Sequence, residues 1–154
     1  MARLSEIPLS ERKMMLELDC SGLEGRRPWA GPKPLAERRI AILSTAALNL
    51  RSDSVFQRSE PSYRVIPGDV DPADLLMSHT SVNFDRTGFQ QDVNVCFPIE
   101  RLRELADEGV IGSVAGYHYT VIGGLHPKDL EPSVRAIARH MKADGTDTVL
   151  LVPI

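Results

Sequence analysis

The sequence predicts an α/β domain in which a mostly parallel sheet is flanked by helices. Two apolar runs, 40–48 and 146–154, have the nearly continuous hydrophobicity of strands that are buried on both faces. Two amphipathic helical segments lie between these runs, and a further strand-like segment separates the helices. The order strand, helix, strand, helix, strand is typical of this class, and 154 residues suit one compact domain.

The segment 1–38 is expected to form an N-terminal helix and loop extension that precedes the core domain of residues 39–154. Residues 9–18 predict a short helix from the spacing of their apolar side chains. Residues 21–34 hold three glycines and three prolines, a composition typical of a loop. Trp29, in the middle of that loop, is expected to pin it to a surface or to a partner subunit.

The core begins with the apolar strand at 40–48. A short second strand is expected within 62–72, where a Pro-Gly-Asp turn ends it. From there to Val95 no period is sustained, and an irregular segment of that length in a compact domain is usually functional. This segment is therefore the first place to look for site residues.

The second half of the chain has clearer signals. Residues 98–109 predict a helix with proline at its start and glycine at its end. Residues 110–124 predict a strand that runs into a glycine-rich loop, residues 127–145 a second helix, and residues 146–154 the last strand. Ligands of open α/β sheets bind beyond the carboxyl ends of the strands, so the end of the last strand is expected at the functional edge.

Composition excludes several classes of protein. A net charge of −3 and a pI near 5.8 argue against a basic groove for nucleic acid. No apolar run approaches the ~18–20 residues of a membrane-spanning helix, and the N-terminus lacks a signal-peptide core, so a cytoplasmic protein without membrane contact is expected. Two cysteines are too few for a disulfide framework, and reduced thiols are the simplest interpretation.

The irregular segment carries the candidate catalytic side chains. Motifs for dinucleotides, nucleoside triphosphates, serine hydrolases and zinc proteases are absent, and no ligand spacing predicts a metal. A histidine and a carboxylate can act as an acid–base pair, because imidazole titrates near neutral pH. The alternative is that the same residues cap turns. The candidates are His79, Asn83, Asp85, Asp92 and Asn94.

Cys96 and His118 are two further candidates. Cys96 precedes the helix that starts near residue 98, and a helix N-terminus can lower the pKa of a thiol. Its apolar neighbours Val95 and Phe97 favour the other interpretation, a buried structural thiol. His118 follows a strand and is expected to line the same edge as His79.

A longer pattern of residues resembles a known family. The runs are ALNLRSD, PSYRVIPGDVDPADLLMSH and DVNVCFPIERLRELADEGVIGSVA, and the tail ARHMKADGTDTVLLVPI continues them. Together they resemble the selenoprotein B family of the glycine, sarcosine, betaine and D-proline reductases. The resemblance covers most of the chain beyond the loop at 21–34.

The resemblance implies a reaction and its participants. Members of the family use a selenocysteine or cysteine to attack the carbon that bears an amine, and the carbon–nitrogen bond is cleaved reductively. The nucleophile follows the strand that matches TVLLVPI, so it is expected just after Ile154, with no separate cofactor. The implied partners are a small amino-acid-like substrate and a thiol or selenol redox partner or second reductase subunit, within a homo- or hetero-oligomer.

The resemblance also implies roles for individual residues. His79 and Asp92 are expected to be catalytic, by orienting or protonating the leaving amine. Asn94 is expected to bind the substrate carboxylate. The complete set of substrate-binding candidates is Thr45, Arg51, Ser52, Asp53, Asn94 and His118.

Two alternatives stay open beside an amino-acid reductase component. We expect the chain to be incomplete at its C-terminus, because an uncovered strand end is a poor way to finish a domain. If it is a naturally short homologue, it is a non-catalytic ligand-binding or assembly module. A diverged thiol enzyme that uses Cys96 is the other alternative.

Overall fold

The computed structural model describes residues 4–19, 31, 33–80 and 85–154, in two compact units, Met1–Gly31 and Pro32–Ile154. The first unit holds a 3₁₀ turn, η1 (Leu4–Glu6), and helix α1 (Leu9–Leu16). Cys20, Trp29, Asn83 and most of the loop expected at 21–34 lie outside the described residues. The division expected between residues 38 and 39 stays a prediction.

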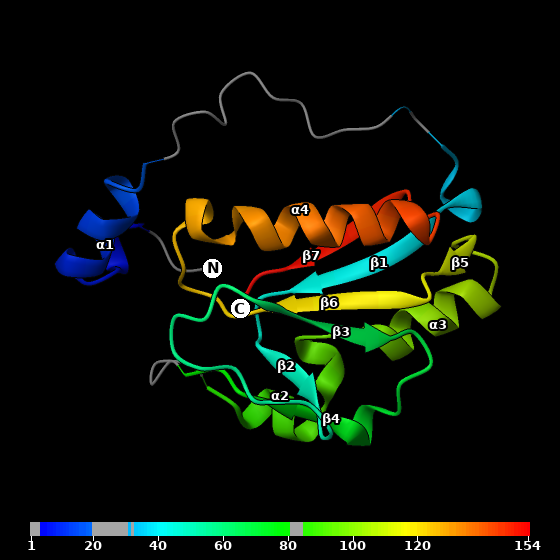
Figure 1. Cartoon of the computed structure of the whole chain (residues 1–154), viewed down its shortest axis with the longest axis horizontal. Helices are drawn as coiled ribbons and strands as arrows, with labels where there is room; N and C mark the ends of the chain where they lie inside the picture. Colours follow the sequence, from blue (N-terminus) through cyan, green and yellow to red (C-terminus); the bar gives the residue numbers. More distant parts are fainter. Residues whose placement is uncertain (1–3, 20–30, 32, 81–84) are drawn as a thin grey trace. The chain divides into compact units, whose positions relative to one another are not determined.

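The second unit is built on a mixed sheet with β1 at its centre (Figure 1). β1 pairs in parallel with β7 along one side and with β5 and then β6 along the other, whereas β3 pairs antiparallel with β6. The prediction of a mostly parallel sheet is therefore only partly right. The strands are β1 (Arg39–Ser44), β3 (Tyr63–Pro67), β5 (Ser113–Val114), β6 (Tyr117–Val121) and β7 (Thr148–Val152).

The antiparallel edge strand β3 is fixed by the turn that follows it. The Gly68 N–H donates to the Gly116 carbonyl over 2.8 Å, which holds the turn against the joint between β5 and β6. A Cβ on Gly68 would lie 2.4 Å from the Ala115 carbonyl oxygen, so only glycine fits there. Pattern alone could not reveal this direction, because a short strand has the same alternation in either orientation.

The apolar run at 40–48, expected to be one strand, is two. β1 ends at Ser44, whose hydroxyl donates to the Cys96 carbonyl and accepts from the Ala46 N–H. Ala47 has a φ of 53°, in the left-handed region that residues other than glycine rarely adopt. The chain thereby leaves the main sheet, and β2 (Leu48–Leu50) forms a two-stranded antiparallel sheet with β4 (Leu75–Met77).

The segment up to Val95, expected to be irregular, contains several short elements. Besides β4 these are the 3₁₀ turns η3 (Pro72–Asp74) and η4 (Val93–Val95) and helix α2 (Thr87–Gln91). Each is five residues or shorter, so none spans enough turns to give a periodic signal. A further 3₁₀ turn, η2 (Leu35–Glu37), leads into β1.

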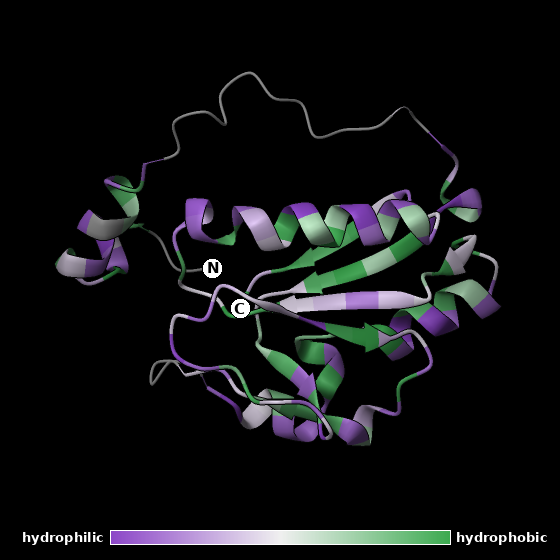
Figure 2. Cartoon of the chain, viewed as in Figure 1, coloured by the Kyte–Doolittle hydropathy of each residue, from purple (hydrophilic) through white to green (hydrophobic). Residues whose placement is uncertain are grey.

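The two predicted longer helices are present, and they cover opposite faces of the sheet. α3 (Ile99–Asp107) packs Ile99 and Leu102 with Ile42 on one face. α4 (Pro127–Ala143) packs on the other face, where Ile137 and Met141 join Tyr119. Figure 2 shows hydrophobic residues on the sheet side of α4 and hydrophilic residues on its outer side. No helix in the described part of the chain is long and apolar enough to cross a membrane.

Candidate functional site

The ends of β1, β6 and β7 meet at one edge of the sheet, which we call the carboxyl edge. It comprises residues 44–47, 122–124 and 153–154, and the three arrows point toward it in Figure 1. β6 pairs with one side of β1 and β7 with the other side. Helix α4 connects β6 to β7, so the chain passes over β1 between these two strands. Ligands of open α/β sheets bind where strand order reverses in this way, outside the strand ends.

Thr45 joins the ends of β1 and β7 at this edge. Its hydroxyl oxygen accepts a hydrogen bond from the Ile154 N–H (2.8 Å) and donates to the Ile154 carbonyl (3.2 Å). Its own backbone N–H donates to the Val152 carbonyl (3.1 Å), and its carbonyl accepts from the Gly123 N–H (3.1 Å). The last residues of β7 are therefore held against the turn after β1.

Gly123 allows the ends of β1, β6 and β7 to approach closely, because a side chain at this position would crowd its neighbours. A Cβ would lie 3.3 Å from the Ile154 carbonyl oxygen and 3.4 Å from that of Thr45. The glycine-rich loop that the sequence predicts contains Gly123 and Gly124, but no local signal predicts the close approach of Gly123 to Ile154. The left-handed Ala47 was missed too, since no local signal marks an alanine for that conformation.

His79 lies one residue beyond a hydrogen bond that ties β4 to the carboxyl edge. The Ser78 N–H donates to the Ala47 carbonyl over 2.9 Å. His79 is buried, and its carbonyl accepts from the Arg86 guanidinium. Burial, and next the positive charge of Arg86, lower the pKa of the His79 imidazole. At neutral pH the ring is therefore uncharged and able to accept a proton.

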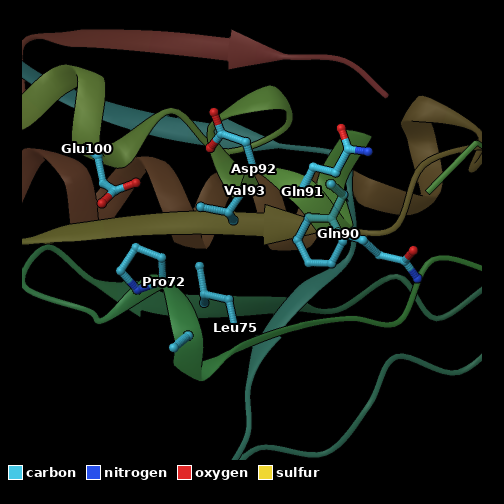
Figure 3. A pocket seen from close by; sticks show the side chains of 9 residues that line it. Pro72, Leu75, Gln90, Gln91, Asp92, Val93 and Glu100 are labelled. Atoms are coloured by element: carbon cyan, nitrogen blue, oxygen red, sulfur yellow. The ribbon is translucent and has the colours of Figure 1, made fainter. Parts of the chain in front are cut away.

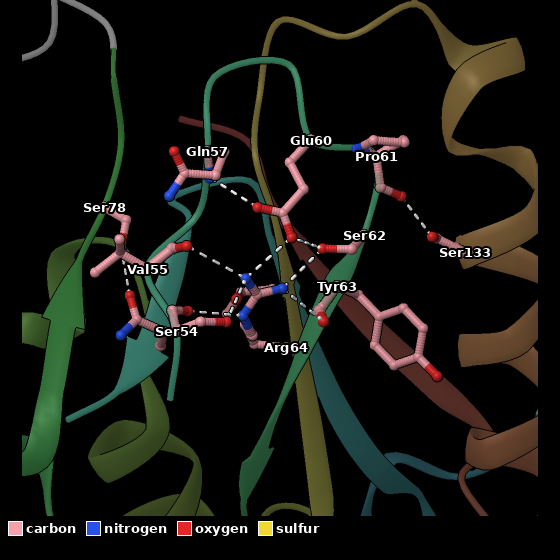
Figure 4. Close-up of polar contacts among 12 residues, drawn as sticks. Ser54, Val55, Gln57, Glu60, Pro61, Ser62, Tyr63, Arg64, Ser78 and Ser133 are labelled. Atoms are coloured by element: carbon pink, nitrogen blue, oxygen red, sulfur yellow. Dashed lines mark hydrogen bonds and ion pairs between the residues drawn. The ribbon is translucent and has the colours of Figure 1, made fainter. Parts of the chain in front are cut away.

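A buttressed loop, residues 54–62, closes one side of the same edge. Figure 4 shows the Arg64 guanidinium at its centre. It donates to the Ser54 carbonyl (3.0 Å), pairs with Glu60 (3.0 Å), and lies 4.2 Å from the ring centre of Phe56. Phe56 packs in turn with Ala47 and Ile122 of the carboxyl edge. Arg64 was not among the predicted site residues, because nothing local in the sequence links it to the start of this loop.

Arg51, Ser52 and Asp53 lie at the other end of β2 from Ala47. They form a turn in which the Arg51 N–H donates to Asp74 and the Asp53 N–H donates to Leu50. The Arg51 guanidinium donates to the Ala73 carbonyl over 3.2 Å. The structure thus separates this predicted trio from Thr45 by the length of β2.

Asp92 and Asn94 form a hydrogen-bonded group at the start of α3. The Asp92 carboxylate accepts from the Asn94 N–H (2.9 Å) and side-chain amide (2.8 Å), and the pKa of Asp92 is lowered by these bonds. Asn94 also bonds the Glu100 carboxylate (2.7 Å) and accepts from the Glu100 N–H (3.1 Å). Asp85 makes a similar turn by accepting from the Thr87 N–H. These side chains cap local turns, which was the alternative that the sequence left open.

Asp92 and Glu100 also line a cavity of about 350 Å³, drawn in Figure 3. Both carboxylates border it together with the amide side chains of Gln90 and Gln91. His79 is not among the lining residues, and the charged neighbour that shifts its pKa is Arg86 rather than Asp92. The structure therefore gives the two predicted catalytic residues separate surroundings. The complete lining is Pro72, Ala73, Leu75, Phe89, Gln90, Gln91, Asp92, Val93 and Glu100.

Cys96 and His118 lie in the interior of the domain. Cys96 is fully buried, and burial raises the pKa of its thiol to about 11. The Nδ1 atom of His118 accepts the Ile42 N–H over 2.9 Å, between the points where β1 pairs with β5 and with β6. Burial lowers the His118 pKa to about 4, and the ring meets Phe97 edge-on. Both side chains complete the core in this arrangement.

The described residues contain no group of three or more histidine, cysteine, aspartate or glutamate side chains that could hold a metal ion. The groups that the structure places at or next to the carboxyl edge are Thr45, His79 and the backbone groups of the three strand ends.

Comparison with known proteins connects this fold to one family. The sequence profile described as glycine/sarcosine/betaine reductase selenoprotein B matches residues 69–153. The D-proline reductase subunit gamma of Acetoanaerobium sticklandii is 34% identical over 122 residues, which are 77% of this chain and 50% of that protein. The glycine reductase complex component B subunit gamma of Symbiobacterium thermophilum is 27% identical over 124 residues, 77% of this chain and 29% of that protein.

A shorter match, 35% identical over 69 residues, is to the glycine reductase complex component B subunit gamma of Carboxydothermus hydrogenoformans and covers 44% of this chain and 16% of that protein. This chain thus spans half or less of the curated relatives that it matches. No solved structure gives a significant match. The matched profile covers more than half of the chain, from the turn after β3 to the end of β7. The chain therefore belongs to the glycine/sarcosine/betaine reductase selenoprotein B family.

Proposed function

We propose that this chain is a component of an amino-acid reductase that cleaves a carbon–nitrogen bond at the carboxyl edge. The observation that carries the proposal is the junction of Thr45 with Ile154, where strand order reverses and β7 ends. A nucleophile placed next along the chain would emerge beside Thr45, in the crevice where open α/β sheets bind their ligands.

The proposed nucleophile is a selenol or thiol that follows Ile154 in the natural protein. It forms a bond to the substrate carbon as the carbon–nitrogen bond breaks, and the amine leaves with the bonding electrons and takes up a proton. A dithiol then supplies two electrons, becomes a disulfide, and releases the carbon in reduced form. A low pKa of the thiol or selenol nucleophile favours its attack on the substrate carbon, because the ionised form is the attacking species.

Thr45 and His79 are the residues that we place nearest to this chemistry. Thr45 fixes the main chain that leads to the nucleophile. His79 is proposed to orient the leaving amine, or to protonate it after taking up a proton itself, because its lowered pKa leaves the ring mostly uncharged at neutral pH. Asp92 stays a proposed catalytic residue, and Asn94 and the Arg51 turn stay proposed substrate-binding residues. Of these, Asp92 borders the cavity beside α3, so its role requires a substrate in that cavity.

The relatives are named as subunits, and we extend to this chain the expectation that it works beside other reductase subunits. Its substrate is expected to be a small amino-acid-like molecule that carries both an amine and a carboxylate. Its electron donor is expected to be a thiol or selenol partner.

The first test is the intact mass of the protein from its native host, with selenol- and thiol-selective alkylation. We expect a mass above the 17.0 kDa of residues 1–154 and one alkylated group beyond Ile154. Dithiol-dependent release of amine from glycine, sarcosine or betaine, or opening of the D-proline ring, should follow. A mass of 17.0 kDa with only Cys20 and Cys96 as thiols would contradict the proposed mechanism.

The role of His79 is tested in the protein that shows this activity. We expect His79→Ala to abolish amine release while the thermal unfolding temperature stays close to that of the parent. His140→Ala is the matched control, because His140 is an exposed histidine on α4 outside the carboxyl edge. Equal turnover by the two variants would remove His79 from the mechanism.

A non-catalytic assembly module is the second candidate function, and the exposed apolar strand β7 favours it. The third alternative, a thiol enzyme based on Cys96, gains no support from a fully buried thiol with a raised pKa. We expect Cys96 to react with iodoacetamide at neutral pH only after denaturation. Rapid alkylation of the folded protein at this position would revive that alternative.

A further inference from the structure

Asn49 is a fully buried amide at the centre of β2, where the local preferences of the chain run against it. It is 0% exposed, and it lies opposite Leu76 of β4. Asparagine is depleted in strands, and burying an amide is unfavourable unless its hydrogen-bonding groups find partners. Natural proteins accept such local contradictions mainly at functional or strained sites.

Both polar atoms of the Asn49 side chain have partners, and these partners fix the orientation of the amide. The Nδ2 atom donates to the Leu50 carbonyl over 2.8 Å. The Oδ1 atom accepts a hydrogen bond from the Ser78 hydroxyl (Figure 4). Ser78 lies two residues beyond Leu76 along the chain, so its side chain is on the same face of the small sheet as that of Asn49.

Ser78 is held at two points by these contacts. Its backbone N–H donates to the Ala47 carbonyl over 2.9 Å, which extends the pairing of β2 with β4 by one residue. The Ala47 N–H donates in turn to the Val121 carbonyl of β6 over 3.1 Å, so this end of the small sheet is tied to the main sheet. The backbone bond fixes the main chain of Ser78, and the bond to Asn49 fixes its side chain.

The next residue along the chain is His79, the proposed proton-transfer group. Its side chain is buried, and burial is the largest cause of its lowered pKa. A proton-transfer group acts only within hydrogen-bond reach of its target, and a displacement of about 1 Å can lower a rate by about 10²-fold. The direction in which the chain leaves Ser78 therefore matters for the place of the imidazole.

We propose that Asn49 is a positioning residue for the reaction: it holds Ser78, and through Ser78 it keeps the His79 imidazole in its buried place next to the carboxyl edge. This inference rests on the proposed function, in which His79 orients or protonates the leaving amine. Asn49 itself touches neither the substrate nor the reacting atoms. An apolar residue would fill the same interior position without a buried amide, but it could not accept the Ser78 hydroxyl.

Two variants break the same hydrogen bond from its two ends. Ser78→Ala removes the donor and leaves the backbone N–H in place, so it is the milder change and remains informative if Asn49→Ala does not fold. Asn49→Ala removes the acceptor. If this one bond carries the effect, the double variant should alter His79 no more than the larger single variant does. Ser78→Thr keeps a hydroxyl and should behave as the parent does.

The place of His79 is measured in the complete protein from its native host. Hydrogen–deuterium exchange at the C2 carbon of the imidazole, followed by mass spectrometry of the peptide that contains it, gives the pKa of one histidine at a time. We expect Ser78→Ala and Asn49→Ala to raise the His79 pKa toward its ordinary value of 6.5. The cause is that a ring released from its buried place regains contact with water.

Thr120→Val is the matched control for a general loss of stability. The buried Thr120 hydroxyl donates to the Leu48 carbonyl, and so reaches the same strand β2 from the side of β6. Its removal should lower the thermal unfolding temperature about as much as Ser78→Ala does, because each change costs one hydrogen bond to β2. We expect Thr120→Val to leave the His79 pKa unchanged.

Turnover of the complete protein gives the second measurement. We expect Ser78→Ala to lower kcat by on the order of 10-fold or more with little change in KM, because a displaced proton-transfer group affects the transition state more than substrate binding. Thr120→Val should keep the kcat of the parent.

Three results would overturn the proposal. The first is a His79 pKa that is the same in the parent, Ser78→Ala and Asn49→Ala, and the second is an equal rise of that pKa in Thr120→Val. The third is full turnover by Ser78→Ala and Asn49→Ala where His79→Ala has none. Failure of the proposed function is recognised separately, because His79→Ala would then keep its turnover, whereas the exchange of His79 still decides whether Asn49 holds it.

Discussion

β1 and β7 are neighbouring parallel strands that are both rich in aliphatic residues, but they differ in their degree of burial. β1 has strands on both sides and a helix on each face, and Ile42 is 0% exposed. β7 shares one side with β1, and Leu151 is 66% exposed. An apolar composition therefore allows a strand to be buried, whereas the place of the strand in the sheet decides how much of it is buried within this chain.

The two strands also differ in the polar groups that touch them. β1 carries the imidazole of His118 against the Ile42 N–H, a bond formed wholly inside the protein. β7 meets side-chain hydrogen bonds only at its ends, near Thr148 and Ile154, among the described residues. Substitutions in β1 should thus act mainly on folding, and substitutions near the end of β7 mainly on the carboxyl edge.

The largest expected effect is at the centre of β1. Ile42→Ala removes a fully buried side chain that packs with Phe97 and Ile99. We expect the free energy of unfolding to fall by about 2–5 kcal/mol, the range for truncating large aliphatic side chains in protein cores. Urea unfolding followed by circular dichroism measures it. A loss as small as that of an exposed residue would mean that β1 is not the centre of the core.

The next effect is a dependence of stability on pH that originates in β1. The pKa of His118 is about 4 in the folded protein, against 6.5 for an exposed histidine. Above pH 6.5 the ring is neutral in both states and contributes nothing. As pH falls from 6.5 to about 4, only the unfolded state gains a proton, so stability falls by an amount on the order of 3 kcal/mol and then levels.

His118→Asn is the control for this pH dependence, because its side-chain oxygen can still accept the Ile42 N–H without titrating. Chemical denaturation at pH 7 and pH 5 should show a smaller difference for the variant than for the parent. His79 also has a lowered pKa, and its contribution is present in both proteins. If the parent and the variant lose equal stability between pH 7 and pH 5, His118 is not the source of the pH dependence.

A smaller effect is expected where β1 and β7 are joined. Thr45→Val keeps the shape of the side chain and removes both hydrogen bonds to Ile154. We expect a loss of about 1–2 kcal/mol and faster amide exchange of the Ile154 N–H, with the centre of β1 still protected. Thr148→Val, at the other end of β7, should leave the exchange of Ile154 unchanged. If the Ile154 N–H exchanges at the same rate in both variants, Thr45 does not hold the end of the chain after β7 against β1.

The smallest effect is expected on the exposed side of β7. Leu151 is 66% exposed, so Leu151→Ala should change the free energy of unfolding by less than about 0.5 kcal/mol. Urea unfolding followed by circular dichroism measures this change. A loss as large as that of Ile42→Ala would show that Leu151 packs within its own chain.

Much of the fold follows from local pattern. The apolar stripe of residues 98–109 and the glycine after it predicted α3, and the same signals at 127–145 predicted α4. The last apolar run predicted β7, and the run of family motifs predicted the family that the comparisons show. The short elements between Met77 and Val95 were not predicted, because a helix or turn of five residues or fewer contains too few positions to establish a period.

The candidate site was harder to predict from the sequence than the fold was. Thr45 and His79 were named, and the structure places both by the turn at Ala47. Asp92 and Asn94 were named with them but lie with α3 and its cavity, and His118 and Cys96 lie in the core. Residue type shows what chemistry a side chain can perform, but the strand pairings decide which side chains share a surface.

By itself, the sequence determined the α/β class, the two long helices, the apolar strands at either end of the core and the family. Those features depend on residues that are near one another in the chain, where side-chain period and capping act. The tertiary structure alone decided the antiparallel direction of β3, the break between β1 and β2, the burial of His118 and the pairing of β7 with β1. These depend on contacts between residues far apart in the chain, because a strand gains its neighbours only when the sheet assembles.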